Sequence, residues 1–299
     1  MHREYKLVDP SKDEVFVRVL LNGLTGGHSG AEIHKGLGNS NKILFEIIAS
    51  LNTIFRIKIV DINGGGLRNA IPRESSLTLS FSKAHLDEFN DYIKKSSIQY
   101  SSKFVKTDPN FNLESENLDI IVPSLSYLDT VNLITSVNQC PNGVFEMSKT
   151  IDNLVETSNN LANIKLNDGK LKIQCLTRSS SEDSKQKLSK IISNIFENIN
   201  CQCILSGGYP GWEPNINSLT LKEAKRSYLN LFLSDPKVNV IHAGLECGII
   251  GSHYPKMDMI SFGPTILGAH SPDEKASISS TKKFWNFFKE VLVNIPERN

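Results

Sequence analysis

The alternation of strand-like and helix-like segments after residue 14 limits most strongly what this chain can fold into. Residues 14–21 alternate apolar and polar side chains, as a half-buried strand does, whereas residues 31–51 place apolar side chains at helical spacing. The predicted elements follow in this order: a strand at 14–21, a helix at 31–51, strands at 55–62 and 75–82, and a helix at 83–96. This β-α-β-β-α order predicts a sheet with helices packed on one face.

The same order recurs, weakly, after an irregular segment at 97–125 that is rich in Ser, Asn and Asp. The predicted elements are a strand at 129–139, a helix at 150–161, a hairpin about Asp168-Gly169, a helix at 181–199 and a strand at 201–206. Asp-Gly favours a two-residue hairpin turn, and a serine cap followed by acidic residues is typical of a helix start. We therefore expect an α/β fold with two tandem β-α-β-β-α-β units over residues 1–206.

A segment dense in Gly and Pro, at 207–215, indicates a hinge or linker and a domain boundary near residue 207. Beyond it the pattern predicts a helix at 219–232, a buried strand that runs into a glycine turn within 238–250, a second buried strand at 257–266, and a C-terminal helix at 277–295. Alternating helices and apolar strands are typical of a parallel α/β layer, for which residues 207–299 are a small domain.

Charge and composition exclude several classes of partner. The chain has 33 basic and 32 acidic residues, a net charge of +1 and 39% hydrophobic residues, so no basic excess favours binding to nucleic acid or an anionic membrane. No apolar run reaches membrane-spanning length, and the charged N-terminus does not resemble a secretory signal. Five scattered cysteines suggest reduced thiols. We expect a cytoplasmic protein.

The segment GLTGGHSGAEIHKGLGN, residues 23–39, combines many glycines with two histidines. It lacks the Gly-Lys-Ser/Thr ending and the dinucleotide spacing, which argues against a phosphate-binding loop. His34 lies inside the predicted helix and cannot share a face with His28, which argues against a metal site made of both. The remaining interpretation is the end of a strand. Its glycines would let the backbone pass close to a ligand, and His28 would lie exposed in the turn before the helix.

Four further polar residues occupy positions open to two interpretations. Asn69 lies in a glycine-rich connection that is either a solvated hairpin or part of a binding site. Arg178 ends a strand, where it is either solvated or grips a carboxylate in bidentate fashion. His270 follows a predicted strand, at the edge where parallel layers bind ligands. Glu246 follows another predicted strand, where a carboxylate either caps a helix or assists a catalytic base.

Eight motifs, taken in order, resemble the aminoacyl-histidine dipeptidases, which belong to the zinc-peptidase superfamily that includes carnosinase and succinyl-diaminopimelate desuccinylase. The motifs are GGHSGAEIHKGLGN, NGGGLRNAIPRE, PNGVFEMS, RSS, YPGWEP, HAGLECG, YPKMDMISFGPTI and GAHSPDE. The resemblance implies a two-metal α/β catalytic domain interrupted by a lid that is duplicated in this branch. Residues 1–206 would be the lid, and residues 207–299 the C-terminal part of the catalytic domain.

The resemblance also implies roles for individual residues. His28 corresponds to the lid histidine that completes the oxyanion site, often across a dimer. Asn69 and Arg178 correspond to lid residues that hold the dipeptide, the arginine by its carboxylate. His270 corresponds to the last metal ligand. A homodimer, a dipeptide substrate and divalent metal, zinc above all, are the expected partners.

One departure from the family is large, because its other ligands precede the lid. They include a His-x-Asp pair, a bridging Asp and a Glu-Glu pair, and no Glu-Glu pair occurs in these 299 residues. The one His-x-Asp, at His85 and Asp87, falls in an amphipathic helix whose i and i+2 positions face different ways. We therefore expect the C-terminal portion of a dipeptidase, inactive alone, with a separate N-terminal catalytic half as a possible partner. The alternative is a non-catalytic dimerisation or regulatory remnant.

Overall fold

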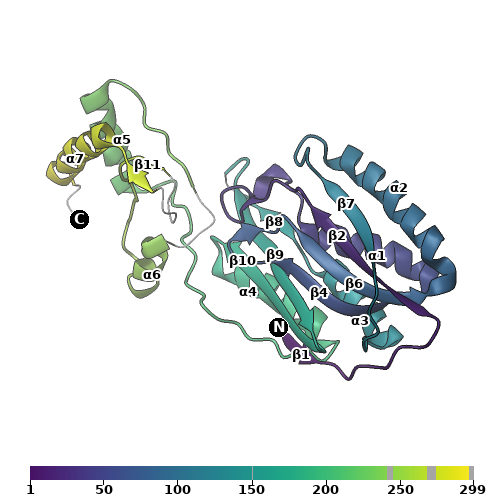
Figure 1. Cartoon of the computed structure of the whole chain (residues 1–299). Coiled ribbons are helices and arrows are strands. Elements are labelled where there is room, and N and C mark those ends of the chain that lie inside the picture. Colours follow the sequence, from purple (N-terminus) through teal and green to yellow (C-terminus); the bar gives the residue numbers. More distant parts are fainter. Residues whose placement is uncertain (150, 241–244, 268–273, 296–299) are drawn as a thin grey trace. The chain divides into compact units, whose positions relative to one another are not determined.

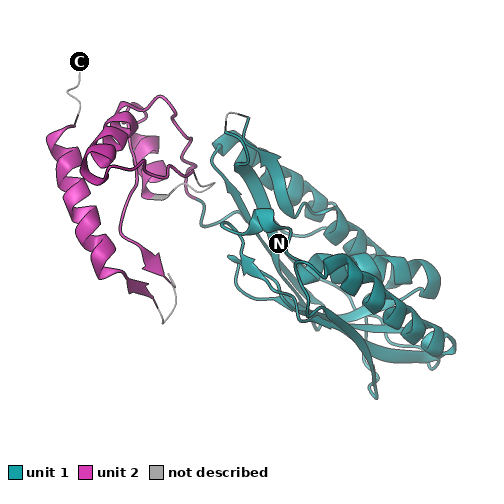
Figure 2. Ribbon diagram, turned by 90° about the horizontal axis from the view of Figure 1, so that it is seen from above, with its two compact units in different colours: residues 1–208 teal, residues 209–299 magenta. Residues whose placement is uncertain are grey.

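The chain divides into two compact units, unit 1 (residues 1–208) and unit 2 (residues 209–299), which Figure 2 colours separately. The structure is a computed structural model. It describes residues 1–149, 151–240, 245–267 and 274–295. No helix in these ranges is long and apolar enough to cross a membrane.

Unit 1 is built on an eight-stranded antiparallel sheet (Figure 1). Its strands are β1 (His2–Glu4), β2 (Glu14–Asn22), β4 (Lys58–Gly65), β6 (Ser75–Ser82), β7 (Asn112–Leu118), β8 (Gly143–Met147), β9 (Val155–Asn167) and β10 (Lys170–Ser179). They are ordered β1-β10-β9-β4-β6-β2-β7, and β8 also pairs with β9. The pairing of β4 with β9, through partners such as Gly64 and Ile164, joins the two halves of the chain into one sheet.

Four helices cover one face of this sheet: α1 (Ser40–Phe55), α2 (Leu86–Phe104), α3 (Tyr127–Gln139) and α4 (Glu182–Glu197). Two 3-10 turns, η1 (Ile33–Lys35) and η2 (Lys83–His85), precede α1 and α2. The period of two along β2 turns Val17, Val19 and Leu21 into the core and leaves Arg18 exposed on the opposite face. The α/β fold class with helices on one face is therefore confirmed.

The first half of unit 1 has the predicted order, strand β2, helix α1, strands β4 and β6, helix α2. A strand then follows, β7, inside the segment predicted to be irregular. The next prediction, a strand at 129–139, is wrong, because these residues belong to helix α3. Ser126 caps that helix by accepting a hydrogen bond from the backbone N–H of Asp129, and Leu133 and Val137 are buried at helical spacing.

The predicted helix at 150–161 is also wrong, because Val155 opens the long strand β9; residue 150 lies outside the described residues. Polar side chains from Thr157 to Asn160 are buried in this strand. The spacing of its apolar residues alone therefore did not show which side chains are buried, and it suggested a helix. The hairpin at Asp168-Gly169 and the helix after it are confirmed. At 201–206, where a strand was predicted, Gln202 forms only an isolated bridge to His2.

Unit 2 contains helices α5 (Leu219–Phe232), α6 (Leu245–His253) and α7 (Ile278–Val293), and a ribbon of strands β11 (Ile266–Leu267) and β12 (Lys275–Ala276). The helices predicted at 219–232 and at the C-terminus are confirmed. Residues 238–240, predicted to begin a buried strand, belong to no strand, and α6 begins at Leu245 where a glycine turn was predicted; residues 241–244 are outside the described ranges. The predicted strand at 257–266 forms no ladder before Ile266.

The described residues of unit 2 therefore form no parallel layer. Rings of Tyr228 and Phe262 pack against Phe287, with centroids 5.3 Å and 4.9 Å apart, and hold α5 and α7 together. Among the hydrophobic side chains that the structure describes in this unit, only Ala224 and Val291 are buried. Ile278, Leu233 and Val293 are 90%, 88% and 82% exposed. Among the described residues of unit 2, the β11–β12 ribbon is the only sheet, and of the two apolar segments that predicted strands only the end of the second, at Ile266, joins it.

Asp108 closes the loop that connects β2 to α1. Its carboxylate is fully buried and accepts one hydrogen bond from the backbone N–H of Thr25 and one from that of Gly38, each 2.9 Å long. The hydroxyl of Thr25 also donates to the carbonyl of Thr107. Hydrogen bonds to an ionised acceptor are the stronger kind. Both ends of the glycine-rich loop are thereby fixed to a single side chain.

We predict that Asp108→Asn lowers the free energy of unfolding by about 1–3 kcal/mol, because the new amide turns a donor toward one of the two backbone N–H groups. Urea denaturation monitored by circular dichroism measures this change. Asp152→Asn, at an exposed turn position, is the matched control and should change stability by less than about 0.5 kcal/mol. Equal unfolding midpoints for the two variants would show that Asp108 does not anchor the loop.

Candidate functional site

His28 and Arg178, far apart in the sequence, both approach Gly30 in unit 1. A Cβ atom on Gly30 would lie 3.1 Å from Cε1 of His28 and 3.3 Å from Nε of Arg178. These separations are tighter than ordinary van der Waals contact, so a glycine here allows both side chains to approach the same backbone. Gly30 was not singled out from the sequence, because its importance depends on a residue contributed by β10.

Asn69 joins the same cluster through the backbone. The short strands β3 (Gly27–His28) and β5 (Ala70–Ile71) pair in antiparallel fashion, with His28 opposite Ala70. The backbone N–H of Ser29 then donates to the carbonyl of Asn69 over 2.8 Å. The structure thus brings together the three residues expected to contact a substrate from unit 1: His28, Asn69 and Arg178.

The imidazole of His28 is oriented by its own loop. Its Nδ1 accepts hydrogen bonds from the backbone N–H groups of Gly30 and Ala31, at 3.2 Å and 3.0 Å. A neutral ring whose Nδ1 is an acceptor carries its proton on Nε2 and can donate from there. The backbone N–H of His28 donates to Glu32, and the Lys35 ammonium and this N–H hold the pKa of the Glu32 carboxyl below its usual value.

Arg178 lies opposite Ser158 in the β9–β10 ladder, so their side chains share one face of the sheet. The Nε of Arg178 and the hydroxyls of Ser158 and Ser29 are buried, and none has a hydrogen-bond partner among the described residues. Ser29 precedes Gly30, which borders Arg178. The unpaired Nε–H of Arg178 thus has one buried hydroxyl, that of Ser158, opposite it in the ladder and another, that of Ser29, one residue from Gly30, a donor set suited to a carboxylate.

Ser158 was missed at the sequence level because its segment was predicted to be a helix. Ser29 was missed although it lies within the histidine motif, because nothing in the sequence indicated that its hydroxyl is buried. The signal that identifies Ser158 is the strand register, which pairs it with Arg178.

The two candidate residues in unit 2, Glu246 and His270, are not part of this cluster as the structure describes it. Glu246 lies exposed in the first turn of α6, where a carboxylate favours the helix N-terminus. His270 lies outside the described residues. Within the described part of the chain, no three His, Cys, Asp or Glu side chains are grouped so as to hold a metal ion. The described residues therefore do not themselves form a metal centre.

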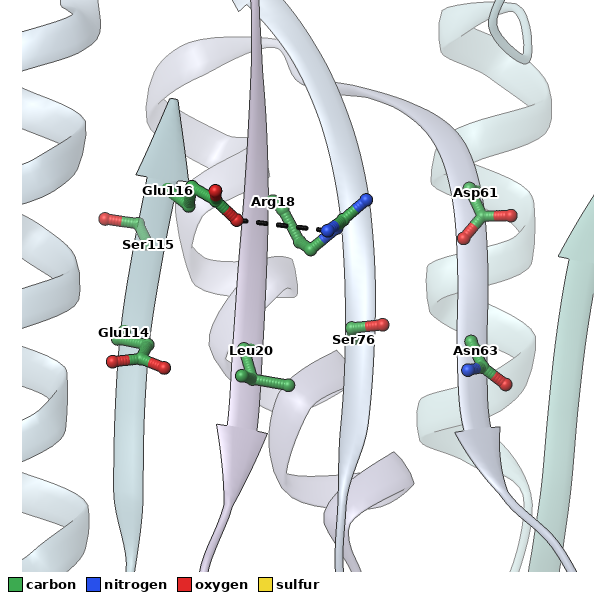
Figure 3. Close-up of a pocket in the computed structure, with 8 residues that line it drawn as sticks. All are labelled: Arg18, Leu20, Asp61, Asn63, Ser76, Glu114, Ser115 and Glu116. Atoms are coloured by element: carbon green, nitrogen blue, oxygen red, sulfur yellow. Dashed lines mark ion pairs between the residues drawn. The ribbon is translucent and has the colours of Figure 1, made fainter. Parts of the chain in front are cut away.

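The uncovered face of the sheet carries a separate polar groove of about 590 Å³ (Figure 3). It is lined by Arg18, Leu20, Asp61, Asn63, Ser76, Glu114, Ser115 and Glu116. Arg18 and Glu116 form an ion pair of 3.9 Å between half-exposed side chains, and burial raises the pKa of the Asp61 carboxyl. None of the three clustered residues lines this groove. A second groove, of about 460 Å³, is bordered by residues 65–67 and 70–74, on both sides of Asn69.

The chain is similar in sequence and in structure to several known hydrolases. Residues 19–100 match the peptidase dimerisation domain. The chain is 35% identical over 289 residues to the cytosol non-specific dipeptidase of Escherichia coli (strain K12), a match that covers 97% of this chain and 59% of that protein. It is 26% identical over 142 residues to a succinyl-diaminopimelate desuccinylase of Sulfurovum sp. (strain NBC37-1), covering 42% of this chain and 33% of that protein.

The crystal structure of aminoacylhistidine dipeptidase from Vibrio alginolyticus superimposes with a TM-score of 0.93 and 33% identity. The match covers 100% of this chain and 61% of that one, so the chain spans less than two thirds of the length of either dipeptidase. The resemblance to the aminoacyl-histidine dipeptidases is thus confirmed along nearly the whole chain, and the match to the peptidase dimerisation domain lies within unit 1.

Proposed function

We propose that this chain provides the substrate-binding and dimer-forming portion of a metal-dependent dipeptidase that hydrolyses Xaa-His and related dipeptides in the cytoplasm. The observation that supports this most directly is the gathering of His28, Asn69 and Arg178 about Gly30. The similarity to two dipeptidases over nearly the whole chain points in the same direction.

Each clustered residue suits one part of a dipeptide. The planar guanidinium of Arg178, with the hydroxyl of Ser158 beside it, is suited to the C-terminal carboxylate. His28, whose Nδ1 is already an acceptor, can donate from Nε2 to the oxygen that becomes negative as the peptide carbonyl is attacked. The exposed amide of Asn69 can orient the peptide between them. These groups position the substrate and stabilise charge, but they do not generate a nucleophile.

The metal requirement is assigned to residues beyond this cluster. We propose His270 as one ligand of a divalent metal, zinc, with the remaining ligands and the general base supplied by a catalytic half that these 299 residues do not contain. Such a metal would activate the attacking water. Residues 1–206 then act as the lid and residues 207–299 as part of the catalytic domain. The exposed apolar side chains of unit 2 support its completion by further protein.

The match at residues 19–100 supports a homodimer built through unit 1. The near-zero net charge gives no electrostatic basis for a nucleic acid or membrane partner. The alternative function is a non-catalytic dimerisation or regulatory module. The match at residues 19–100 fits that alternative as well, and Glu246 in the first turn of α6 does not separate the two.

We predict that the purified chain alone hydrolyses no Xaa-His dipeptide and binds zinc weakly, because one proposed histidine ligand is too few for a stable site. Zinc titration against a competing chelator, together with a peptide hydrolysis assay, measures both properties. Tight stoichiometric zinc with hydrolysis by this chain alone would contradict the division of labour proposed here.

A second prediction separates His28 from His270 in the enzyme completed with a catalytic half. His28→Ala should leave metal content unchanged and lower kcat by roughly a hundred- to a thousandfold, as expected for a lost oxyanion donor. His270→Ala should lower metal content together with activity. Metal analysis and steady-state kinetics on both variants make the comparison. Metal loss in His28→Ala, with His270→Ala fully loaded, would reverse the two assignments.

A further inference from the structure

A buried asparagine in the middle of the sheet holds the exposed loop that carries Asn69. Asn160, on β9, is 1% exposed. Its Nδ2 donates to the carbonyl of Arg68 over 3.1 Å and to that of Ala70 over 2.8 Å. These are the carbonyls on either side of Asn69. One side-chain amide therefore brackets the backbone of a proposed substrate residue.

Arg68 and Asn69 form an exposed turn, and the neighbouring Leu67 is 73% exposed, whereas Ile71 is buried in a cluster with Ile33 and Val155. Apolar packing thus holds the end of the loop at Ile71 but not the turn itself. A short backbone hydrogen bond, from Ala70 to Leu67, closes the turn on itself but does not tie it to the sheet. The two bonds from Asn160 provide that tie.

The amide of Asn160 is itself held in one orientation. Its Oδ1 accepts a hydrogen bond from Nδ2 of Asn39, the residue that caps helix α1. Asn39 also donates to Asn142 and to the carbonyl of Leu161, at 3.0 Å and 3.2 Å. With its acceptor oxygen engaged on this side, Asn160 must direct its donor nitrogen toward the loop.

The influence of Asn160 extends to His28. Ala70, whose carbonyl Asn160 holds, begins strand β5 and lies opposite His28 of β3. The N–H of Ser29 donates to the carbonyl of Asn69 itself. A displacement of the 68–70 backbone would therefore move the strand pair on which the imidazole is mounted.

We propose that Asn160 is a positioning residue for the candidate site: it fixes Asn69 directly and His28 through the β3–β5 pair. The roles of those two residues in binding a dipeptide rest on the proposed function. The mechanical link among the three residues can be tested without it.

The test uses the full chain, uniformly labelled with ¹⁵N, and the variant Asn160→Asp. A carboxylate of nearly the same shape cannot donate to two carbonyls and repels both of them. Asn163→Asp is the matched control, because Asn163 is also a buried amide of β9, 3% exposed, and donates to Gly65 of the same connection over 3.0 Å. Urea unfolding first establishes that both variants fold. If the acidic variants do not fold, Asn160→Ala and Asn163→Ala replace them.

We expect the amide of Ser29 to exchange with solvent roughly tenfold faster, or more, in the Asn160 variant than in the control, once exchange is corrected for global stability. The His28 ring resonances should shift in the Asn160 variant and remain in place in the control. Equal Ser29 exchange rates in the two variants, with unshifted His28 resonances, would overturn the proposal.

A second readout uses the enzyme completed with a catalytic half. If Asn160 acts through Asn69, the losses of kcat/KM in Asn160→Ala and Asn69→Ala should be non-additive in the double variant, whereas those of Asn163→Ala and Asn69→Ala should add. Additive losses for the first pair would also overturn the positioning role. Faster Ser29 exchange in the Asn160 variant, with no dipeptide hydrolysis by the wild-type chain even when it is completed with a catalytic half, would instead refute the proposed function and leave the link intact.

Discussion

Strand β9 and its buried amides are the constraint on which the rest of unit 1 depends. Its backbone pairs with β4, β8 and β10, so it joins the first half of the chain to the second. Its side chains Asn159, Asn160 and Asn163 are nearly fully buried and donate to carbonyls of two connections, one at Pro141 and the other at Gly65 and Arg68. Buried amides are costly unless they are hydrogen-bonded, and when satisfied they specify one arrangement of their partners.

The candidate site is therefore assembled at the meeting point of rigid elements. Asp108 accepts hydrogen bonds from both ends of the glycine-rich loop, at Thr25 and Gly38. Strand β3 of this loop pairs with β5, which begins at the end of the connection that Asn160 holds. Arg178 reaches the same point from β10, beside Ser158 of β9. This arrangement favours a site that binds and orients a ligand, for which we propose a dipeptide.

The sequence predicted some of this well and failed where tertiary contacts override local pattern. Clean alternation along 14–21 and 75–82 identified β2 and β6, whereas α3 was read as a strand and β9 as a helix. Buried polar residues of β9 are stabilised by partners distant in the chain, which a local window does not contain.

The residues of the candidate site also fall into those that the sequence predicted and those that it did not. Its motifs marked His28, Asn69 and Arg178, and the structure brings these residues together. Gly30 and Asp108 escaped notice because their contacts depend on strand register and loop closure, which no spacing in the sequence reveals. In unit 2, apolar runs predicted a sheet, although the described residues form a ribbon and three helices with much apolar surface exposed.

The central claim is that the cluster around Gly30 recognises a dipeptide by its carboxylate, and the Nε–H group of Arg178 reports on it directly. Nuclear magnetic resonance of the arginine side chains, during titration with an Xaa-His dipeptide and separately with its C-terminal amide, is the decisive measurement. The account predicts a saturable shift of the Arg178 Nε–H resonance with the dipeptide and a much weaker response to the amide. An unchanged resonance, or equal responses to both ligands, would contradict it.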